Sequence, residues 1–253
     1  MDVIVTLAGK SKRFKDKGYK DPKFLLPIGN SFVLAQVLNQ FDDKDNFHLV
    51  YSVSQSKNIP NLKKKFLNLK KNINLYLVED HEKGPVYSAL QAKNINQDAE
   101  VIVTYCDFLV TWNYNKFKRI CKGYDSSLVT FKNFHPSSFS GTLYCYLKNK
   151  GSLITKISEK RSFTNKPQEE PAATGMHYFS SNKVFREYSE KALNSKVFKK
   201  KYREFYMSLP YIFLLKNNKT ILNFEAENFI SLGTPKDYEE FIAWRNYFKK
   251  YEY

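Results

Sequence analysis

The sequence has few of the residues that build disulfide frameworks and metal clusters. Among 253 residues there are three cysteines, Cys106, Cys121 and Cys145, and four histidines. No two cysteines have the CxxC spacing and no two histidines are four residues apart, so neither a disulfide framework nor a zinc site is predicted. We therefore expect a reduced, cytoplasmic setting.

Long apolar runs are also missing. The opening run MDVIV is short and contains Asp2, so no signal peptide is expected. The longest later run, LPYIFLL, has far fewer than the about 20 residues that a bilayer-spanning helix needs. The sequence therefore predicts a soluble protein with no membrane span.

Acidic residues are scarce relative to basic ones: 25 Asp and Glu stand against 41 Lys and Arg, a formal net charge of +16. Such a charge attracts nucleic acid, acidic lipid or small phosphorylated substrates, but lysine-rich solvated surfaces are also ordinary. The interleaved basic and aromatic residues of an RNA-binding platform are absent, so nucleic acid is the least favoured partner.

The first half of the chain alternates two kinds of segment. Four apolar runs, DVIVTLA, FHLVYSV, INLYLVE and EVIVTYCDF, have the composition of buried strands. Between them, residues 32–41, 59–69 and 86–95 have helical spacing. This order predicts βαβ units and a largely parallel sheet.

The second half has a different pattern. SLVTFKNF, GTLYCYLKN and LITKISEKR predict strands in an antiparallel or mixed extension. Residues 162–175 contain two prolines and predict a mobile surface loop, and residues 181–209 predict a helical stretch. A strand that ends at Gly233 is then followed by a cap at Thr234, Pro235 in the first helical turn, and a closing helix over 241–248.

The stretch LAGKSKRFKDKGYKDPKFLLPIG (7–29) is the first candidate site. Ile4 stands where a P-loop needs its first glycine, and Lys10 to Lys15 contains no further glycine for a dinucleotide fingerprint. What remains is a strand end, a small Ala8-Gly9 pair, and Arg13 with Lys23. Exposed backbone N–H groups with fixed cations suit a polyphosphate, although each residue also has an ordinary interpretation as turn or surface.

Six motifs follow one another along almost the whole chain. As an ordered set they resemble the nucleotidyltransferase family, which includes sugar-1-phosphate nucleotidyltransferases: LAGKSKRF…GYKDPKFLLPI, EKGPVYSALQA, VIVTYCDFLVTW, ISEKR, AATGMHYF and SLGTPKDYEEF. The resemblance implies an α/β fold, a Rossmann-like α/β/α sandwich with a mixed, mainly parallel central sheet. It implies one domain over 1–253, with a nucleotide-binding half (1–125) and an acceptor-binding half (126–253).

The resemblance also implies a reaction and the residues for it. An acceptor phosphate attacks the α-phosphate of a nucleoside triphosphate, pyrophosphate leaves, and Mg²⁺ assists. The implied catalytic residues are Arg13, Lys23 and Lys160. The implied nucleotide-binding residues are Leu7, Ala8, Gly9, Gly84, Pro85 and Ser88, the acceptor-binding residues are Glu159, Lys160 and Gly175, and the metal ligand is Asp107.

Each of these residues has a competing structural interpretation. Asp107 is also suited to cap a following helix or turn, and Gly84 with Pro85 to an ordinary helix start. The cluster that contains Glu159 and Lys160 is equally typical of a solvated surface, and Gly175 of a simple bulge.

Two departures from the family pattern bear on the site. Lys10 to Lys12 stand where many relatives have a second glycine, which favours a grip on phosphate through side chains. Ser231 stands where many sugar-phosphate members have an aspartate as second metal ligand. Asp237, Glu225 and Glu227 are nearby in sequence, and the sequence does not choose among them.

Within the family the chain looks most similar to capsule-pathway enzymes that make a phosphoramidate decoration. That similarity implies CTP and L-glutamine phosphate as substrates. An amino-acid acceptor calls for a cation and a carboxylate, for which Arg161, Lys160, Glu159 and Glu169 are candidates, and the 162–175 loop is placed to close over it.

Three other classes remain open. A sugar-1-phosphate nucleotidyltransferase would share the first-half motifs, and a glycosyltransferase usually needs a DxD motif where YCDF has one carboxylate. A non-catalytic nucleotide-binding or nucleic-acid-binding protein is the remaining alternative. The sequence leaves the oligomeric state unknown.

Overall fold

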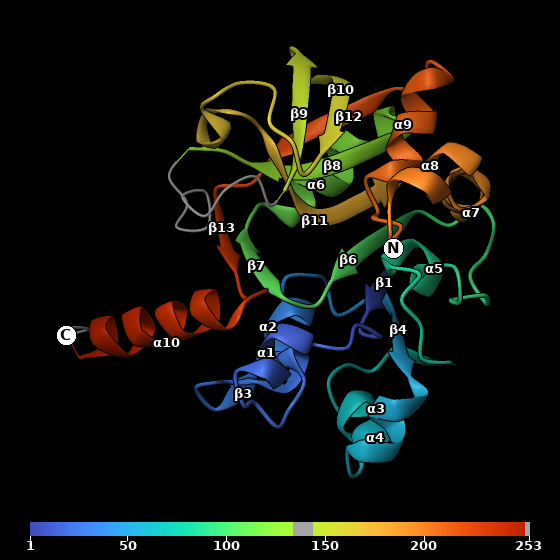
Figure 1. Cartoon of the computed structure of the whole chain (residues 1–253). Coiled ribbons are helices and arrows are strands. Elements are labelled where there is room, and N and C mark those ends of the chain that lie inside the picture. Colours follow the sequence, from blue (N-terminus) through green and yellow to red (C-terminus); the bar gives the residue numbers. More distant parts are fainter. Residues whose placement is uncertain (134–143, 251–253) are drawn as a thin grey trace.

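The computed structural model describes residues 1–133 and 144–250. Their centre is a nine-stranded mixed sheet (Figure 1). In spatial order its strands are β5 (Ile73–Val78), β4 (Asn46–Ser52), β1 (Asp2–Thr6), β6 (Val101–Tyr105), β11 (Ala172–Phe179), β8 (Ser126–Phe131), β12 (Ile221–Glu225), β10 (Leu153–Glu159) and β9 (Cys145–Lys150). The ends of the expected strands SLVTFKNF and GTLYCYLKN lie outside the described residues.

The four strands expected in the first half form and pair in parallel, which confirms that part of the prediction. β12 also pairs with β8 in parallel, but β11 is antiparallel to both its neighbours, and β10 is antiparallel to β12 and β9. The mixed sheet is therefore confirmed, but its parallel pairs do not predominate. The reason is that β11 enters the sheet between β6 and β8 in the opposite direction, a long-range pairing without a local sequence signal.

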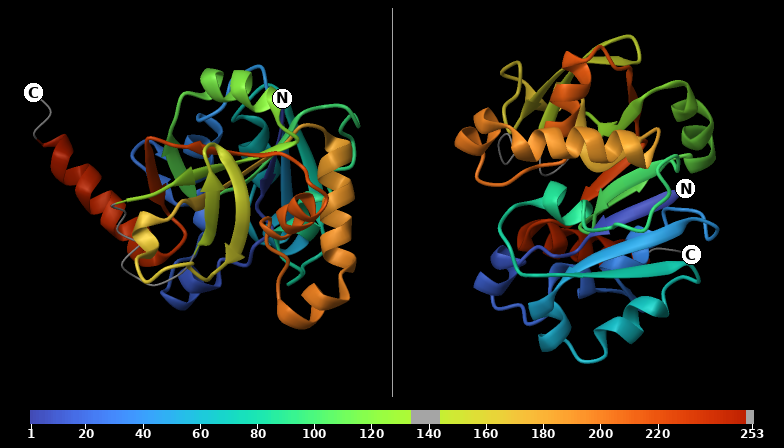
Figure 2. Two further views of the ribbon diagram at one scale, coloured as in Figure 1. Left: turned by 90° about the horizontal axis from the view of Figure 1, so that it is seen from above. Right: turned by 90° about the vertical axis from the view of Figure 1, so that its right-hand side faces the viewer.

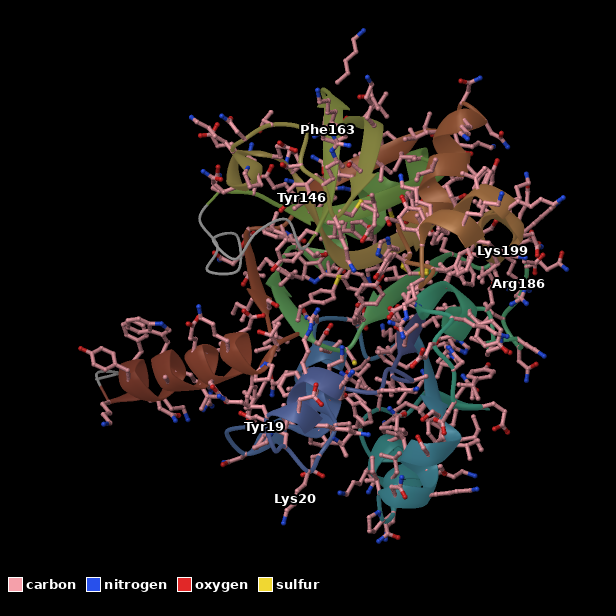
Figure 3. All side chains as sticks on the ribbon, viewed as in Figure 1. Tyr19, Lys20, Tyr146, Phe163, Arg186 and Lys199 are labelled. Carbon is pink, nitrogen blue, oxygen red and sulfur yellow. The ribbon has the colours of Figure 1, made fainter. Side chains whose placement is uncertain are left out.

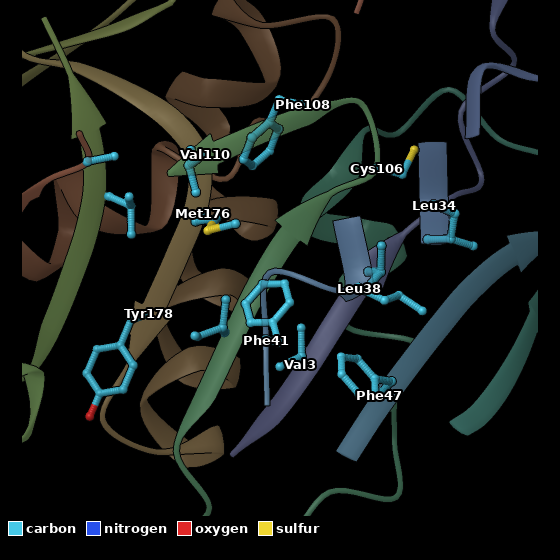
Figure 4. Packing of buried hydrophobic residues seen from close by; sticks show 14 of the residues in the cluster. Val3, Leu34, Leu38, Phe41, Phe47, Cys106, Phe108, Val110, Met176 and Tyr178 are labelled. Atoms are coloured by element: carbon cyan, nitrogen blue, oxygen red, sulfur yellow. The ribbon is translucent and has the colours of Figure 1, made fainter. Parts of the chain in front are cut away.

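Helices cover the sheet on both faces. One face packs against α2 (Val33–Leu38), α4 (Leu62–Leu67) and α6 (Tyr114–Ile120), and Figure 4 shows part of that core around Leu34, Leu38 and Phe47. The other face packs against α5 (Pro85–Ala89), α7 (Asn182–Asn194) and α9 (Leu209–Lys216). The remaining elements are α1 (Lys12–Asp16), η1 (Lys23–Leu25), β2 (Pro27–Ile28), β3 (Ser31–Phe32), α3 (Val53–Asn58), β7 (Phe108–Thr111), η2 (Cys121–Gly123), η4 (Pro167–Glu169), α8 (Lys196–Lys201), β13 (Asn228–Ser231) and α10 (Pro235–Lys249).

Two expected segments differ from the structure. The 162–175 segment is pinned by the buried Glu170 carboxylate, which accepts hydrogen bonds from the backbone of Phe163 and Thr164 (2.8 and 2.6 Å), and its last residues already belong to β11. The helical stretch 181–209 is interrupted: Ser195 caps a separate α8, and residues 202–208 form a loop before α9. This loop matters below because it reaches the site.

The expected helix cap and proline position near the end of the chain are confirmed, although the preceding strand ends at Ser231 and not at Gly233. The Thr234 side chain accepts a hydrogen bond from the Asp237 backbone N–H, and Pro235 is the first residue of α10. The helix begins six residues earlier than the apolar spacing of 241–248 indicated.

β11 contains a bulge at the centre of the sheet. Its register against β8 shifts between Ala173 and His177. At the bulge the Thr174 hydroxyl donates a hydrogen bond to the Val129 carbonyl of β8 (3.0 Å). The next residue, Gly175, has φ 113°. A Cβ at Gly175 would lie 2.8 Å from ring carbons of both Phe108 and Tyr105. The alternative that Gly175 is a bulge residue is therefore correct, and it brings the backbone against two rings at the carboxyl end of β6.

His177, directly after the bulge, is 2 % exposed and lies between the rings of Tyr105 and Tyr211. Within the described residues its Nδ1 atom has no hydrogen-bond partner. Burial lowers the pKa of His177 to about 3, so this imidazole is neutral at physiological pH.

We predict that Gly175→Ala destabilises the protein by about 2–4 kcal/mol, because alanine adds both a strained φ and a clash with two packed rings. Urea denaturation measures the free energy of unfolding. Gly123→Ala is the matched control, since a Cβ added there would have no atom within 4 Å and the φ of Gly123 is ordinary. Equal stability of the two variants would contradict this account of the bulge.

We also predict that His177 makes the protein less stable as the pH is lowered. The unfolded state takes up a proton near pH 6.5 and the folded state only near pH 3, so the free energy of unfolding decreases as pH falls between these values. Between pH 7 and pH 4 the loss in His177→Gln should be smaller than in the wild type by about 3 kcal/mol. Denaturant titrations at both pH values test this, and identical losses would show that His177 does not carry the effect.

Candidate active site

A cleft of about 620 Å³ lies at the carboxyl ends of β1 and β6. This is the edge of an open α/β sheet where ligands bind. The cleft brings together all but one of the site residues expected from the sequence: Ala8, Gly9, Arg13, Lys23, Gly84, Pro85, Ser88, Asp107, Glu159, Lys160 and Gly175. The exception is Leu7, which is 1 % exposed and belongs to the core.

The loop after β1 forms one wall of the cleft. Gln55 holds its backbone, because the side-chain amide donates to the carbonyl oxygens of Leu7 (2.8 Å) and Gly9 (3.2 Å). Gln55 is itself fixed by a capping box with Ser52. The S-x-x-Q spacing of SVSQ is typical of a capping box and could have predicted this helix start. It gives no indication that Gln55 also binds the loop after β1.

Lys23 and Asp107 meet inside the cleft. The Lys23 Nζ atom lies 2.5 Å from the Asp107 Oδ2 atom, and both side chains are largely covered. Burial alone would lower the pKa of Lys23, but the Asp107 carboxylate outweighs it and raises that pKa above its usual value. The ammonium therefore stays charged next to a carboxylate.

Asp107 does not act as a helix cap. The residue after it begins β7 rather than a helix, and its carbonyl accepts a hydrogen bond from the Leu232 N–H (2.7 Å). This bond attaches the end of β6 to the segment that follows β13. The alternative interpretation of Asp107 as a cap for the next helix is thus excluded.

Gly84 and Pro85 start α5, as the ordinary interpretation also expected, but their setting is unusual. A Cβ on Gly84 would lie 2.5 Å from the Phe205 backbone N, and φ is 87°. Phe205 donates to the Lys83 carbonyl (3.0 Å) and accepts from the Val86 N–H (3.1 Å). The 202–208 loop is therefore bonded, backbone to backbone, to the turn that the resemblance assigns to nucleotide binding.

Ser88 lies on the inner side of this turn. It is 4 % exposed, and its hydroxyl lies 3.1 Å from His81 Nε2 and 3.4 Å from the Gly84 carbonyl oxygen. Its hydroxyl thus already has partners within the turn.

Glu159 is the last residue of β10, Lys160 follows it, and both line the cleft. The Glu159 carboxylate accepts a hydrogen bond from Ser208 (2.5 Å), and burial raises its pKa. The Ser208 hydrogen bond and the charge of the neighbouring Lys160 oppose this shift without cancelling it. The interpretation as a solvated cluster is therefore wrong for Glu159.

Lys160 is exposed and has φ 56°, a left-handed conformation that is uncommon outside glycine. Its ammonium donates to the Tyr206 hydroxyl (2.5 Å) and lies 4.1 Å from the centroid of that ring. Arg161 and Glu169, also considered for the acceptor, are exposed and do not line the cleft.

Several residues of the cleft were missed by the sequence analysis. Glu82 joins the two sides, because its carboxylate contacts Lys10 (2.9 Å) and Arg203 (3.2 Å). Tyr105, His177, Arg203, Tyr206 and Ser208 also line it. Three of these five belong to the 202–208 segment, for which the sequence predicted a helix. Nothing in the sequence distinguished these three residues from ordinary surface residues of that helix.

The structure distinguishes the three carboxylates near the C-terminal turn. Asp237 lines the cleft, and its Oδ2 atom lies 3.0 Å from the Ser231 hydroxyl. Glu225 contacts Lys132, and Glu227 follows β12 away from the cleft. A Cβ at Gly233 would lie 3.2 Å from Asp107 Oδ2 and 3.6 Å from Ser231 Oγ, so the glycine leaves a small space between these two oxygens.

Within the described residues no three His, Cys, Asp or Glu side chains form a metal-binding group.

The same residues include no helix long and apolar enough to cross a bilayer.

No protein-family model matches the chain, and no curated protein is similar to it in sequence. Solved structures share its fold. A nucleoside-diphosphate-sugar pyrophosphorylase from Vibrio cholerae RC9 superposes with a TM-score of 0.78 at 17 % identity over 96 % of this chain and 100 % of the other. A UDP-glucose pyrophosphorylase complexed with UDP-glucose gives 0.71 at 16 % identity over 98 % of each chain.

An inositol-1-phosphate CTP transferase from T. maritima gives a TM-score of 0.66 at 15 % identity, over 96 % of this chain and 94 % of the other. At these identities the comparisons establish a shared fold over almost the full length. The chain therefore has the mixed α/β architecture of these pyrophosphorylases and of this CTP transferase.

Proposed function

We propose that this protein is a nucleotidyltransferase, which moves a nucleoside monophosphate from a nucleoside triphosphate to a phosphorylated acceptor. The observation that carries the proposal is the cleft itself. Arg13 and Lys23 from the first loop, Asp107 from the end of β6, and Lys160 from the end of β10 line one cavity although they are far apart in sequence. The structural neighbours, which are pyrophosphorylases and a CTP transferase, support the same class of reaction.

The chemistry requires charge neutralisation more than proton transfer. The acceptor phosphate oxygen is already anionic, so it attacks the α-phosphorus without a general base. The new P–O bond forms as the bond from the α-phosphorus to the bridging oxygen of the β-phosphate breaks, and pyrophosphate leaves. Positioning and electrostatic stabilisation must bring the two anions together. We assign Arg13 and Lys23 to the triphosphate and leaving pyrophosphate, and Lys160 to the acceptor phosphate.

Asp107 suits a Mg²⁺ ion, because a carboxylate oxygen is the ligand that this cation prefers. When bound, Mg²⁺ would neutralise charge on the phosphates. Ser231, which stands in place of a family aspartate, would offer its hydroxyl oxygen, and Asp237 would place a negative charge 3.0 Å behind that hydroxyl. The space left by Gly233 between Asp107 and Ser231 supports this arrangement.

For the substrates we propose CTP and L-glutamine phosphate, since the motifs are most similar to CTP:phosphoglutamine cytidylyltransferase of capsular phosphoramidate synthesis. Glu159 supports an amino-acid acceptor, because a half-buried carboxylate in the cleft whose pKa is raised by burial favours a ligand that carries an ammonium group. The second candidate is a sugar-1-phosphate acceptor, favoured by the sugar pyrophosphorylases among the neighbours.

One prediction of the proposed function concerns turnover. With Mg²⁺, the protein should release pyrophosphate from CTP and phosphoglutamine, and not from UTP, GTP, ATP or dTTP, nor with sugar-1-phosphates. Asp107→Asn and Lys23→Met should each lower the rate at least about 100-fold, because each removes a charge that faces the reacting phosphates. Glu227→Gln is the control outside the cleft and should retain activity.

Release with a sugar phosphate would move the assignment to the second candidate. Failure with every pair, in a folded protein that still binds CTP, would refute the acceptor assignment. An Asp107→Asn variant with full activity would refute the metal role.

Another prediction of the proposed function concerns the second metal ligand. Mn²⁺ binding in the presence of α,β-methylene CTP, counted by electron paramagnetic resonance, should weaken about 10–100-fold in Asp237→Asn and in Ser231→Ala. Ser231→Asp should restore Mn²⁺ affinity to Asp237→Asn, because it places a carboxylate directly at the site. Wild-type Mn²⁺ affinity in Asp237→Asn would show that Asp237 only supports the start of α10.

A further inference from the structure

The two edges of the central sheet differ in sequence. β9, at one edge, carries the exposed Lys148 and Lys150, and charges of this kind discourage pairing with a further strand. β5, at the other edge, has the sequence INLYLV, with neither a charged residue nor a proline. Figure 2 shows β5 beside β4 at the margin of the sheet. The β5 edge therefore lacks the usual protection against pairing.

The free side of β5 presents the backbone of alternate residues. The Phe47 N–H donates to the Asn72 carbonyl (2.8 Å), and the parallel register pairs Phe47 with Ile73. Even-numbered residues of β5 therefore bond to β4, while Ile73, Leu75 and Leu77 direct their N–H and C=O groups away from it. Within the described ranges no other segment bonds to these groups. This edge has donors and acceptors for one more strand.

The side chains of the same three residues form an apolar row. Ile73, Leu75 and Leu77 alternate with the even-numbered residues, so their side chains lie on one face of the sheet. Ile73 and Leu75 pack against the core cluster that contains Phe47, whereas Leu77 is 54 % exposed. The row thus begins in the core and ends at the surface.

Opposite charges flank the strand. Lys71 precedes β5 and Glu79 follows it, both are exposed, and neither forms an ion pair or a hydrogen bond within the described part of the chain. Suppose that two copies of β5 pair antiparallel, with Leu75 of one facing Leu75 of the other. Lys71 of each copy then lies opposite Glu79 of the second copy, and Ile73 lies opposite Leu77.

Only this register satisfies the backbone, the apolar row and the charges together. A shift by one residue sets outward-directed backbone groups against groups that already bond to β4. A shift by two residues sets Lys71 opposite Leu77, or Glu79 opposite Ile73, and loses both charge pairs. The sequence of the strand is therefore complementary to itself. We propose that the free edge of β5 is a homodimer interface, in which two copies pair antiparallel about a two-fold axis at Leu75.

A single pair of strands makes a small interface. In this register the outward-directed residues of the two copies exchange about six backbone hydrogen bonds, each of which contributes modestly to stability in water. One strand from each copy covers less than the about 1,200 Å² at which standard-size interfaces begin. We therefore expect a dissociation constant in the micromolar range.

Sedimentation velocity of the full chain from about 1 to 100 µM tests the proposal. The wild type should convert from monomer to dimer over this range. Leu77→Pro should dimerise at least about 10-fold more weakly, because proline removes an outward-directed N–H. The bonds from β5 to β4 stay intact in this variant, and an edge strand tolerates proline at such a position.

A charge exchange makes the test specific for the register. Lys71→Glu should weaken dimerisation about 3–10-fold, since it sets glutamates opposite each other, and adding Glu79→Lys should restore it. Lys199→Glu is the matched control: Lys199, labelled in Figure 3, is an exposed lysine of α8, and its reversal should leave dimerisation unchanged.

Hydrogen exchange locates the contact. The Leu75 and Leu77 amides should exchange more slowly as the protein concentration rises, because they gain acceptors only in the dimer. The Tyr76 amide, which is directed toward β4, is the internal reference and should change little.

A wild type that stays monomeric at 100 µM would overturn the proposal, even if it binds an extended peptide of another sequence at this edge. So would a dimer that forms equally well in Leu77→Pro and Lys71→Glu, or one whose Leu75 and Leu77 amides exchange as in the monomer. None of these measurements uses catalytic activity, so the proposed function is tested separately.

Discussion

The ion pair between Lys23 and Asp107 is the contact on which the organisation of the cleft depends. Lys23 follows the cationic loop after β1, and Asp107 lies two residues after β6, so the pair joins the first loop to the centre of the sheet. The backbone bond from Leu232 to Asp107 adds a third segment to the same point. Three distant parts of the sequence are thereby held where a ligand with several phosphates would need them.

The first half of the fold was predictable from the sequence because its information is local. Apolar runs rich in Val and Ile, separated by helical spacing, define β1, β4, β5 and β6 and their parallel order. The place of β11 was not predictable, since antiparallel insertion between β6 and β8 depends on contacts between residues far apart. The loop over 202–208 was missed because the sequence has helical composition both before and after it.

The residues of the cleft were also predictable only where the information is local. Residues in ordered motifs, such as Arg13, Asp107 and Lys160, could be named and do lie in one cleft. Residues that act through tertiary proximity could not be named: Ser208 holds Glu159, and Gln55 holds the first loop, although neither stands in a motif for that task. Leu7 shows the opposite error, because its place in a motif did not make it a lining residue.

The backbone bonds between Phe205 and the turn at Gly84 have a thermodynamic consequence. The same loop carries Tyr206, which holds Lys160 on the acceptor side, so one continuous piece of chain touches both proposed substrate sites. A ligand that shifted this loop by binding at one proposed site would change the affinity of the other, and binding linkage requires that effect to be equal in both directions. The order in which the two substrates arrive then changes the path taken, while the total free energy of forming the ternary complex stays the same.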